Sequence, residues 1–151
     1  MWGLTSLASF DSYVGAIECH KRALIGADKD DTSSYQALAQ LHEQIGEVAE
    51  AAAYHRRCID ISQRAGKPVQ TYSKNAIELA RYEMLKGWWP KGPLPATIYP
   101  EMLPDGPQPI SSFGGNMMLA KEYLEMISTS NCAEVKEAED LLRVWKKFVV
   151  E

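Results

Sequence analysis

The sequence predicts an all-α fold of stacked helical hairpins, and three observations support this prediction. One stretch of sequence recurs after about one hairpin length, apolar residues return at helical spacing, and glycine or proline follows the candidate helices. The apolar fraction of 46% and the charged fraction of 24% are ordinary for a folded globular chain. The 151 residues are enough for one compact domain or a few stacked repeats.

The repeat lies in two nine-residue segments that begin at Ala16 and Ala51, 35 residues apart. Small residues recur at matching positions of both segments, as do a histidine (His20 and His55) and an arginine. A period of about 34 residues is typical of tetratricopeptide hairpins. Residues 1–151 are therefore predicted to form a single tetratricopeptide-repeat region, wound as a right-handed superhelix with a C-terminal capping helix.

The repeat over residues 31–65 is the best preserved. Its first helix is expected from about residue 35 to Gly46, with N-cap candidates just before it, and its second from about 48 to 64. Two antiparallel helices approach closely only where side chains are small. Those positions are assigned here to Ala39, Ala51 and Cys58.

The first repeat, residues 1–28, is incomplete. Its second helix is expected over about residues 13–25, whereas residues 1–10 match the expected first helix poorly. Half of a hairpin cannot bury its apolar face. The sequence is therefore interpreted as a C-terminal fragment, or as a truncated or misassembled gene product.

The third repeat, residues 71–128, is interrupted by a proline-rich loop at 88–115 that holds seven of the eight prolines. Proline at this density excludes a helix, and an insert at a hairpin tip costs little stability. The partner helix is expected to resume at Asn116. Trp88, Trp89 and the prolines have two interpretations: a ligand for an SH3 or WW domain, or a mobile insert whose tryptophans pack on the hairpin. The second is favoured.

The segment 131–150 is predicted to be a helix that caps the stack. Asn131 and Glu134 resemble a capping box. One apolar stripe follows at helical spacing, formed by Val135, Ala138, Leu142, Trp145 and Val149.

The composition and motifs argue against several classes of function. The net charge of -4 gives no general reason to bind nucleic acid or a membrane surface. No apolar run approaches the roughly 18 residues of a membrane span, and the N-terminus does not resemble a secretory signal. Three scattered cysteines favour a reducing compartment.

No catalytic or cofactor site is evident. Cys19 with His20, and His55 with Cys58, do not converge as metal ligands or as an activated nucleophile pair. No phosphate-binding glycine loop is present. The acidic run at Glu43, Glu47 and Glu50 and the paired basic residues are interpreted mainly as solvated helix faces. The chain is therefore predicted to be no enzyme and to hold no metal or cofactor.

Three stretches carry a family resemblance: residues 37–45, 51–59 and 119–124, together with the final helix. They resemble the C-terminal repeats of subunit eight of the anaphase-promoting complex, the cell division cycle protein twenty-three family. This resemblance implies a scaffold in a ubiquitin ligase that acts in mitotic cell-cycle progression, in the nucleus and/or cytoplasm. It implies other subunits and the activating subunit as partners, and a homodimer only in a longer chain. The alternative is a tetratricopeptide adaptor of another multiprotein assembly.

Tetratricopeptide repeats bind peptides on the first helices of successive hairpins. The groove candidates on those helices are Gln36, Gln40, Glu43, Gln44, Lys74, Ile77 and Arg81. The second repeat lacks the basic and amide set that clamps a C-terminal carboxylate, so an internal peptide with some apolar and basic character is expected. The competing interpretation is that these residues form only a solvated polar surface.

Overall fold

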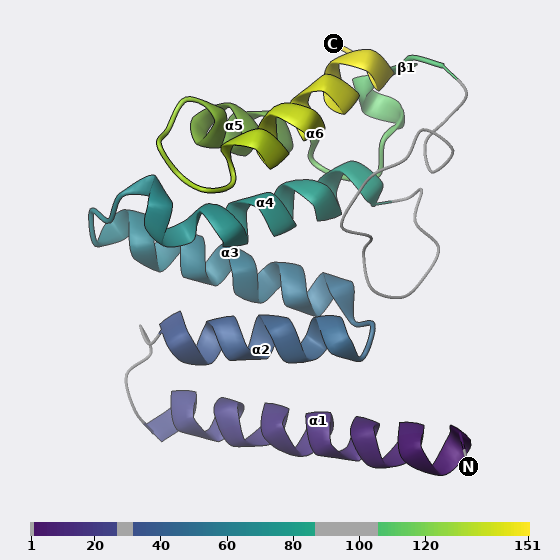
Figure 1. Ribbon diagram of the computed structural model, residues 1–151, viewed down its shortest axis with the longest axis vertical. Coiled ribbons are helices and arrows are strands. Elements are labelled where there is room, and N and C mark those ends of the chain that lie inside the picture. Colours follow the sequence, from purple (N-terminus) through teal and green to yellow (C-terminus); the bar gives the residue numbers. More distant parts are fainter. Residues whose placement is uncertain (1, 27–31, 87–105) are drawn as a thin grey trace.

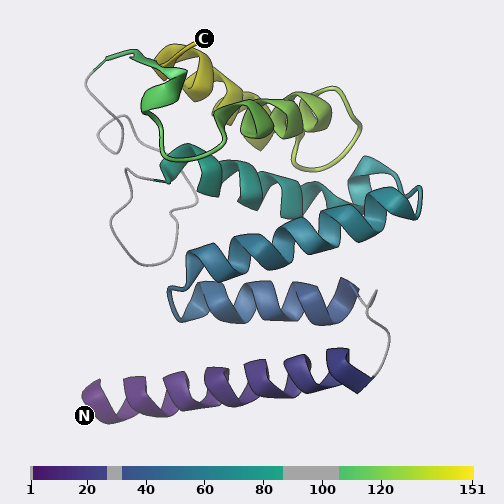
Figure 2. The same ribbon diagram turned by 180° about the vertical axis from the view of Figure 1, so that it is seen from behind.

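The computed structural model describes residues 2–26, 32–86 and 106–151. Its helices are α1 (Trp2–Gly26), α2 (Thr32–Gln44), α3 (Val48–Arg64), α4 (Val69–Leu85), α5 (Met117–Ser128) and α6 (Val135–Phe148). Each helix packs on a neighbour in sequence, and α4 also touches α6. Figures 1 and 2 show the helices as successive layers from the N-terminal to the C-terminal end. The predicted all-α hairpin stack is confirmed.

The two helices of the second repeat end in the same way. Gly46 and Gly66 have φ of 82° and 70°, in the left-handed region that glycine adopts without steric cost. The amide of the following residue then bonds back to the helix, from Glu47 to the carbonyl of His42 at 2.8 Å and from Lys67 to that of Ser62 at 3.0 Å. These bonds satisfy carbonyls that a helix end would otherwise leave unpaired. Both predicted helix ends are confirmed.

The first repeat differs from the prediction. Helix α1 is continuous from Trp2 to Gly26, whereas a helix was expected only from about residue 13. Beyond Gly3, no glycine or proline interrupts the sequence before Gly15, so nothing local stops the helix from extending. Among the described side chains of α1, Ile17 is buried, with 4% of its surface exposed.

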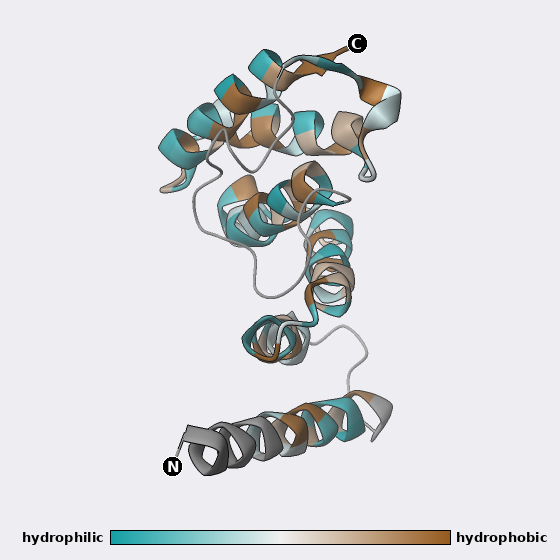
Figure 3. Cartoon of the chain, turned by 90° about the vertical axis from the view of Figure 1, so that its right-hand side faces the viewer, coloured by the Kyte–Doolittle hydropathy of each residue, from teal (hydrophilic) through white to brown (hydrophobic). Residues whose placement is uncertain are grey.

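The core begins where α2 and α3 cross and extends to the C-terminal helix. The predicted small residues Ala39, Ala51 and Cys58 are all buried, each at most 2% exposed. Larger apolar side chains then fill the layers between α3 and α6, where Leu85, Leu124 and Ile127 are fully buried. Figure 3 shows that helices α2 to α6 each carry both hydrophobic and hydrophilic residues, as expected for amphipathic helices in a stack.

The capping helix is present, and its expected anchor is buried. Trp145 is 2% exposed, and its indole Nε1 donates a hydrogen bond to the carbonyl oxygen of Met117 at 2.9 Å. The predicted capping box is wrong. Glu134 is the N-cap residue but makes no side-chain cap bond; its carboxylate instead accepts a hydrogen bond from the Ser73 hydroxyl. The helix consequently starts at Val135 rather than at Asn131.

The insert between α4 and α5 is only partly the independent loop that the prolines suggested. Trp88, Trp89 and the other residues up to 105 lie outside the described part of the chain. Strand β1 (Gln108–Pro109) pairs in parallel with β2 (Val149–Val150), and the 3-10 turn η2 (Ile110–Ser112) follows it. Two of the twenty positions assigned to helix 131–150 are therefore strand.

The end of the insert is fixed tightly to α4. Phe113 is 7% exposed, and a Cβ built on Gly115 would lie 1.8 Å from the carbonyl oxygen of Glu83. The amide of Asn116 donates to the Glu83 carboxylate at 2.5 Å, and its own side chain caps α5 by accepting from the Leu119 amide. The predicted helix restart at Asn116 is confirmed, while residues 106–115 belong to the packed fold.

Candidate peptide-binding groove

Two adjoining depressions lie along the face formed by α2, α3, α4 and the start of α6. The larger encloses about 240 Å³ and is lined by Gln36, Gln40, Glu43, His55, Lys74, Ile77, Glu78, Glu134 and Glu137. The smaller encloses about 140 Å³ and is lined by Glu43, Gln44, Val48, Ala51, Ala52, His55, Glu78 and Tyr82. Because Glu43, His55 and Glu78 line both, the two form one continuous groove, called here the α2–α4 groove.

The structure brings together most of the residues predicted from the sequence. Five of them line the larger depression, namely Gln36, Gln40, Glu43, Lys74 and Ile77, and Gln44 lines the smaller one. Gln40, Gln44 and Lys74 are exposed, whereas Ile77 is 2% exposed and lies at the floor. Arg81 lines neither depression and is 3% exposed. Its predicted role as a ligand contact is therefore corrected.

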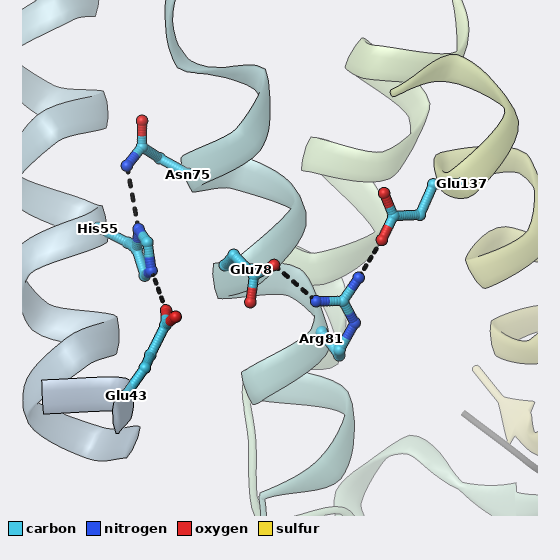
Figure 4. A network of polar contacts seen from close by, with 6 residues as sticks. All are labelled: Glu43, His55, Asn75, Glu78, Arg81 and Glu137. Atoms are coloured by element: carbon cyan, nitrogen blue, oxygen red, sulfur yellow. Dashed lines mark hydrogen bonds and ion pairs between the residues drawn. The ribbon is translucent and has the colours of Figure 1, made fainter. Parts of the chain in front are cut away.

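Arg81 instead connects α4 to α6 (Figure 4). One guanidinium nitrogen lies 2.8 Å from the carboxylate of Glu78, and another pairs with Glu137. A guanidinium is charged at any ordinary pH, and burying it is costly unless carboxylates compensate. The arrangement thus fixes both carboxylates at the edge of the groove.

A chain of hydrogen bonds ties the other helices together beneath the groove. The ring of His55 on α3 lies between Glu43 of α2, at 2.5 Å from Nε2, and Asn75 of α4, at 3.0 Å from Nδ1 (Figure 4). The amide nitrogen of Asn75 also donates to the Gln36 side-chain oxygen. Since an amide NH₂ can only donate, Nδ1 of His55 must be the acceptor, which leaves the ring proton on Nε2 for Glu43.

These polar partners were not all found from the sequence. The recurrence of histidine at His20 and His55 identified His55 as a repeat position, but it did not predict the hydrogen bonds of His55 to Glu43 and Asn75. Asn75 and Glu78 had no signal, because a single polar residue on a helix looks the same whether it faces solvent or a neighbouring helix. Glu134 was assigned to a helix cap, and Glu137 was not singled out.

The charges in the larger depression are unbalanced. Four carboxylates line it, those of Glu43, Glu78, Glu134 and Glu137, together with the ammonium of Lys74. With the adjacent Arg81 included, four negative charges face two positive ones, a net charge of -2 while His55 is neutral. A concave surface with low-dielectric walls concentrates such a potential and favours a cationic ligand.

The smaller depression is mainly apolar. Val48, Ala51, Ala52 and Tyr82 contribute its apolar lining. Ala51 and Ala52 are 2% and 6% exposed, and their short side chains leave the space between α3 and α4 open. The α2–α4 groove therefore combines an acidic part and an apolar part.

The candidate nucleophile and metal residues have other environments. Burial raises the pKa of the Cys58 thiol to about 11, so it remains protonated, and its Sγ lies 3.7 Å from the carbonyl oxygen of Thr32. Within residues 2–26, 32–86 and 106–151, no three or more His, Cys, Asp and Glu side chains gather as a metal site. In the same part of the chain, no helix has both the length and the apolarity of a membrane span.

Comparison with known proteins gives one weak relationship. The chain is 24% identical over 139 residues to the anaphase-promoting complex subunit CDC23 of Saccharomyces cerevisiae. The alignment covers 90% of this chain but only 18% of that protein. No family model matches the chain, and no solved structure matches it. Most of this chain is thus similar to a short part of an anaphase-promoting complex subunit.

Proposed function

We propose that this chain is a non-catalytic protein-interaction scaffold within a ubiquitin ligase of the anaphase-promoting type, acting in mitotic cell-cycle progression. The observation that carries the proposal is the α2–α4 groove, whose lining comes from α2 and α4, the first helices of successive hairpins, together with α3 and the start of α6. The similarity to CDC23, spread over 90% of the chain, supports the choice of assembly. In this proposal the groove receives a segment of another subunit, such as the activating subunit.

The bonding in the groove suits recognition better than catalysis. His55, the residue best suited to act as a general base, is 6% exposed and has both ring nitrogens engaged with neighbouring helices. A general base must reach a proton on its substrate, and His55 is held away from that task. The same bonds hold the groove in one shape before a ligand arrives. Such preorganisation lowers the entropy cost of binding.

The proposed partners are the other subunits of the ligase and its activating subunit, in the nucleus and/or cytoplasm. No nucleic acid, membrane or cofactor enters the proposal. A homodimer would need repeats beyond those described here. Within the described part of the chain, the exposed groove side chains of Gln40 and Gln44 make no hydrogen bond or ion pair, so they are suited to contact a partner.

Copurification tests the proposal directly. When an epitope-tagged chain is expressed in cells of its source organism and purified, subunits of the ubiquitin ligase should copurify with it and be identified by mass spectrometry. A Gln40→Ala/Gln44→Ala variant should lose the partner that occupies the groove and retain the others. The matched control is Gln63→Ala/Gln70→Ala, which removes the same side-chain type from two exposed positions that do not line the groove.

Two results would contradict the proposal. Recovery of a different, defined complex would assign the chain to another assembly and make it an adaptor there. If the parent, the groove variant and the control recover every partner equally, the α2–α4 groove does not bind any of those partners.

A further inference from the structure

Another depression lies at the end of the hairpins and shares no lining residue with the α2–α4 groove. Figure 1 shows that α2 begins, α3 ends and α4 begins at this edge of the stack. The depression encloses about 440 Å³, within the range of roughly 300–1,000 Å³ that is usual for ligand pockets. It is called here the hairpin-end pocket, and it is lined by Thr32, Ile61, Ser62, Arg64, Ala65, Lys67 and Thr71.

The charged side chains of the hairpin-end pocket are basic. Its described lining includes Arg64 and Lys67 and no Asp or Glu. Both side chains are exposed, and neither forms an ion pair with any residue that the structure describes. Arg64 donates from Nε to the carbonyl oxygen of Asp60 at 3.4 Å, which leaves the outer nitrogens of its guanidinium for a ligand. Two cations without a carboxylate beside them favour an anion.

The buried hydroxyl of Ser62 faces the same pocket. Ser62 is 5% exposed, and within residues 2–26, 32–86 and 106–151 its side chain forms no hydrogen bond. The unpaired side-chain atoms that are completely buried in those ranges are His42 Nε2 and Arg81 Nε, so the Ser62 oxygen opens into the pocket that Ser62 lines. Buried hydroxyls usually have a partner, because an unpaired one destabilises the fold. The Ser62 hydroxyl is therefore available to a ligand.

The helix ends around the pocket also favour an anion. Thr32 is the first residue of α2, and Thr71 lies in the first turn of α4. The N-terminal end of a helix carries a partial positive charge, and its first amides have no partner within the helix. The C-terminal end of α3 has the opposite sign, but its last carbonyls are engaged. Those of Ile61 and Ser62 accept hydrogen bonds at 3.0 Å from the amides of Ala65 and Lys67.

We propose that the hairpin-end pocket binds a phosphate monoester, the group carried by a phosphorylated serine or threonine side chain and by small phosphate esters. The Ser62 hydroxyl donates to one phosphate oxygen from the floor, and Arg64 and Lys67 pair with the other oxygens from the rim. Ile61 and Ala65 contact the carbon atoms next to the ester oxygen. The inference goes beyond the proposed function and does not depend on the α2–α4 groove.

The site is tested in the whole 151-residue chain. Three aspartates, Asp28, Asp30 and Asp31, precede Thr32 in the sequence and lie outside the described residues, and their charges oppose an anion. The isotope-labelled chain is titrated at low salt with a pentapeptide of one phosphoserine flanked by glycines, and the amide signals are followed by NMR. The signals of Ser62, Lys67 and Thr71 should shift with the phosphopeptide and stay unchanged with the same peptide lacking the phosphate.

Phenyl phosphate distinguishes the two sources of the phosphate group. If it binds at the same signals as tightly as the phosphopeptide, the pocket takes a small phosphate ester. If the phosphopeptide binds more tightly, the pocket takes a phosphorylated side chain. Both results support a monoester site, since the same atoms bind the phosphate group.

Two variants test the residues. Arg64→Gln/Lys67→Gln should weaken binding of the phosphopeptide about tenfold or more, because two charged partners of the phosphate are lost. The matched control is Lys136→Gln/Arg143→Gln, which makes the same change in net charge at exposed positions outside the pocket and should bind like the parent. Ser62→Ala should bind about three- to tenfold more weakly without a lower melting temperature, because its hydroxyl has no partner in the described part of the fold.

Several results would overturn the inference. A parent spectrum that the phosphopeptide leaves unchanged, or shifts confined to residues away from the pocket, would exclude the site. Equal weakening in Arg64→Gln/Lys67→Gln and in the control would show that binding follows net charge alone. A clear fall in the melting temperature of Ser62→Ala would show that the hydroxyl is bonded within the fold. None of these results bears on copurification, so the scaffold function would stand or fall separately.

Discussion

Replacing Trp145 by alanine is the sharpest test of how the stack is closed. The indole is 2% exposed and packs among the side chains of α4, α5 and α6. Its Nε1 donates to the Met117 carbonyl, and the ammonium of Lys121 lies 4.9 Å from the ring centre. Truncation therefore removes a large buried ring, a hydrogen bond and a cation–π contact.

The magnitude follows from these contacts. Deleting a buried tryptophan side chain costs about 3–5 kcal/mol. At about 2–4 °C per kcal/mol for a chain of this size, the melting temperature should fall by roughly 10 °C. Trp145→Phe keeps most of the apolar contact and loses the Nε1 bond, so its cost should be about 1–2 kcal/mol.

Urea denaturation followed by circular dichroism measures the effect, with Arg143→Ala as the control. The Arg143 side chain is 75% exposed on the same helix, and its ion pair with Asp140 is worth about 0–1 kcal/mol. The order of stability should be parent, then Trp145→Phe, then Trp145→Ala, with the control near the parent. A Trp145→Ala variant with an unchanged midpoint would show that α6 does not close the stack.

Three further expectations follow from buried positions. Ala51→Leu should cost about 1–3 kcal/mol in denaturation experiments, because Ala51 lies on α3, which packs against α2, and is only 2% exposed; parent-like stability would mean that this position has room for a larger side chain. Gly115→Ala should lower the melting temperature, because its Cβ would lie 1.8 Å from the Glu83 carbonyl oxygen. Gly106→Ala, which has open space, is its control, and equal melting of the two variants would refute the close approach. Burial raises the pKa of Cys58 from 9.0 to about 11, so the folded chain keeps a proton that the unfolded chain loses. Stability should therefore fall as pH rises from about 9 to 11, and the denaturation midpoints of Cys58→Ala should depend less on pH over this range. A parent protein whose midpoint does not fall between these pH values would contradict the burial of the thiol.

Features set by short stretches of sequence were predictable. Gly46 and Gly66 end helices because the left-handed conformation there suits glycine, and this preference is visible without the partner elements. The burial of Trp145 followed from an apolar stripe at helical spacing. The burial of the small residues Ala51 and Cys58 likewise followed from the repeat itself.

Features that depend on distant partners were not predictable in the same way. Glu134 lies where a capping box would use it, but Ser73 of another helix offers a competing hydrogen bond. Arg81 lies on the first helix of its hairpin, the usual groove side, yet α6 covers it through Glu137. The pairing of Gln108 with Val149 joins two short segments without any repeating pattern. Each outcome is decided by tertiary neighbours rather than by local preference.

The insert has a consequence for the order in which the hairpins fold. Helices α2 and α3 are joined by three residues, 45–47, whereas 31 residues, 86–116, separate α4 from α5. Bringing the ends of the longer connection together costs roughly 2 kcal/mol more chain entropy, from the logarithmic dependence on loop length. We expect the α2–α3 hairpin to form early and the α4–α5 contact to form late, together with the β1–β2 pair. The C-terminal half of the groove, including Glu137, would then be completed last.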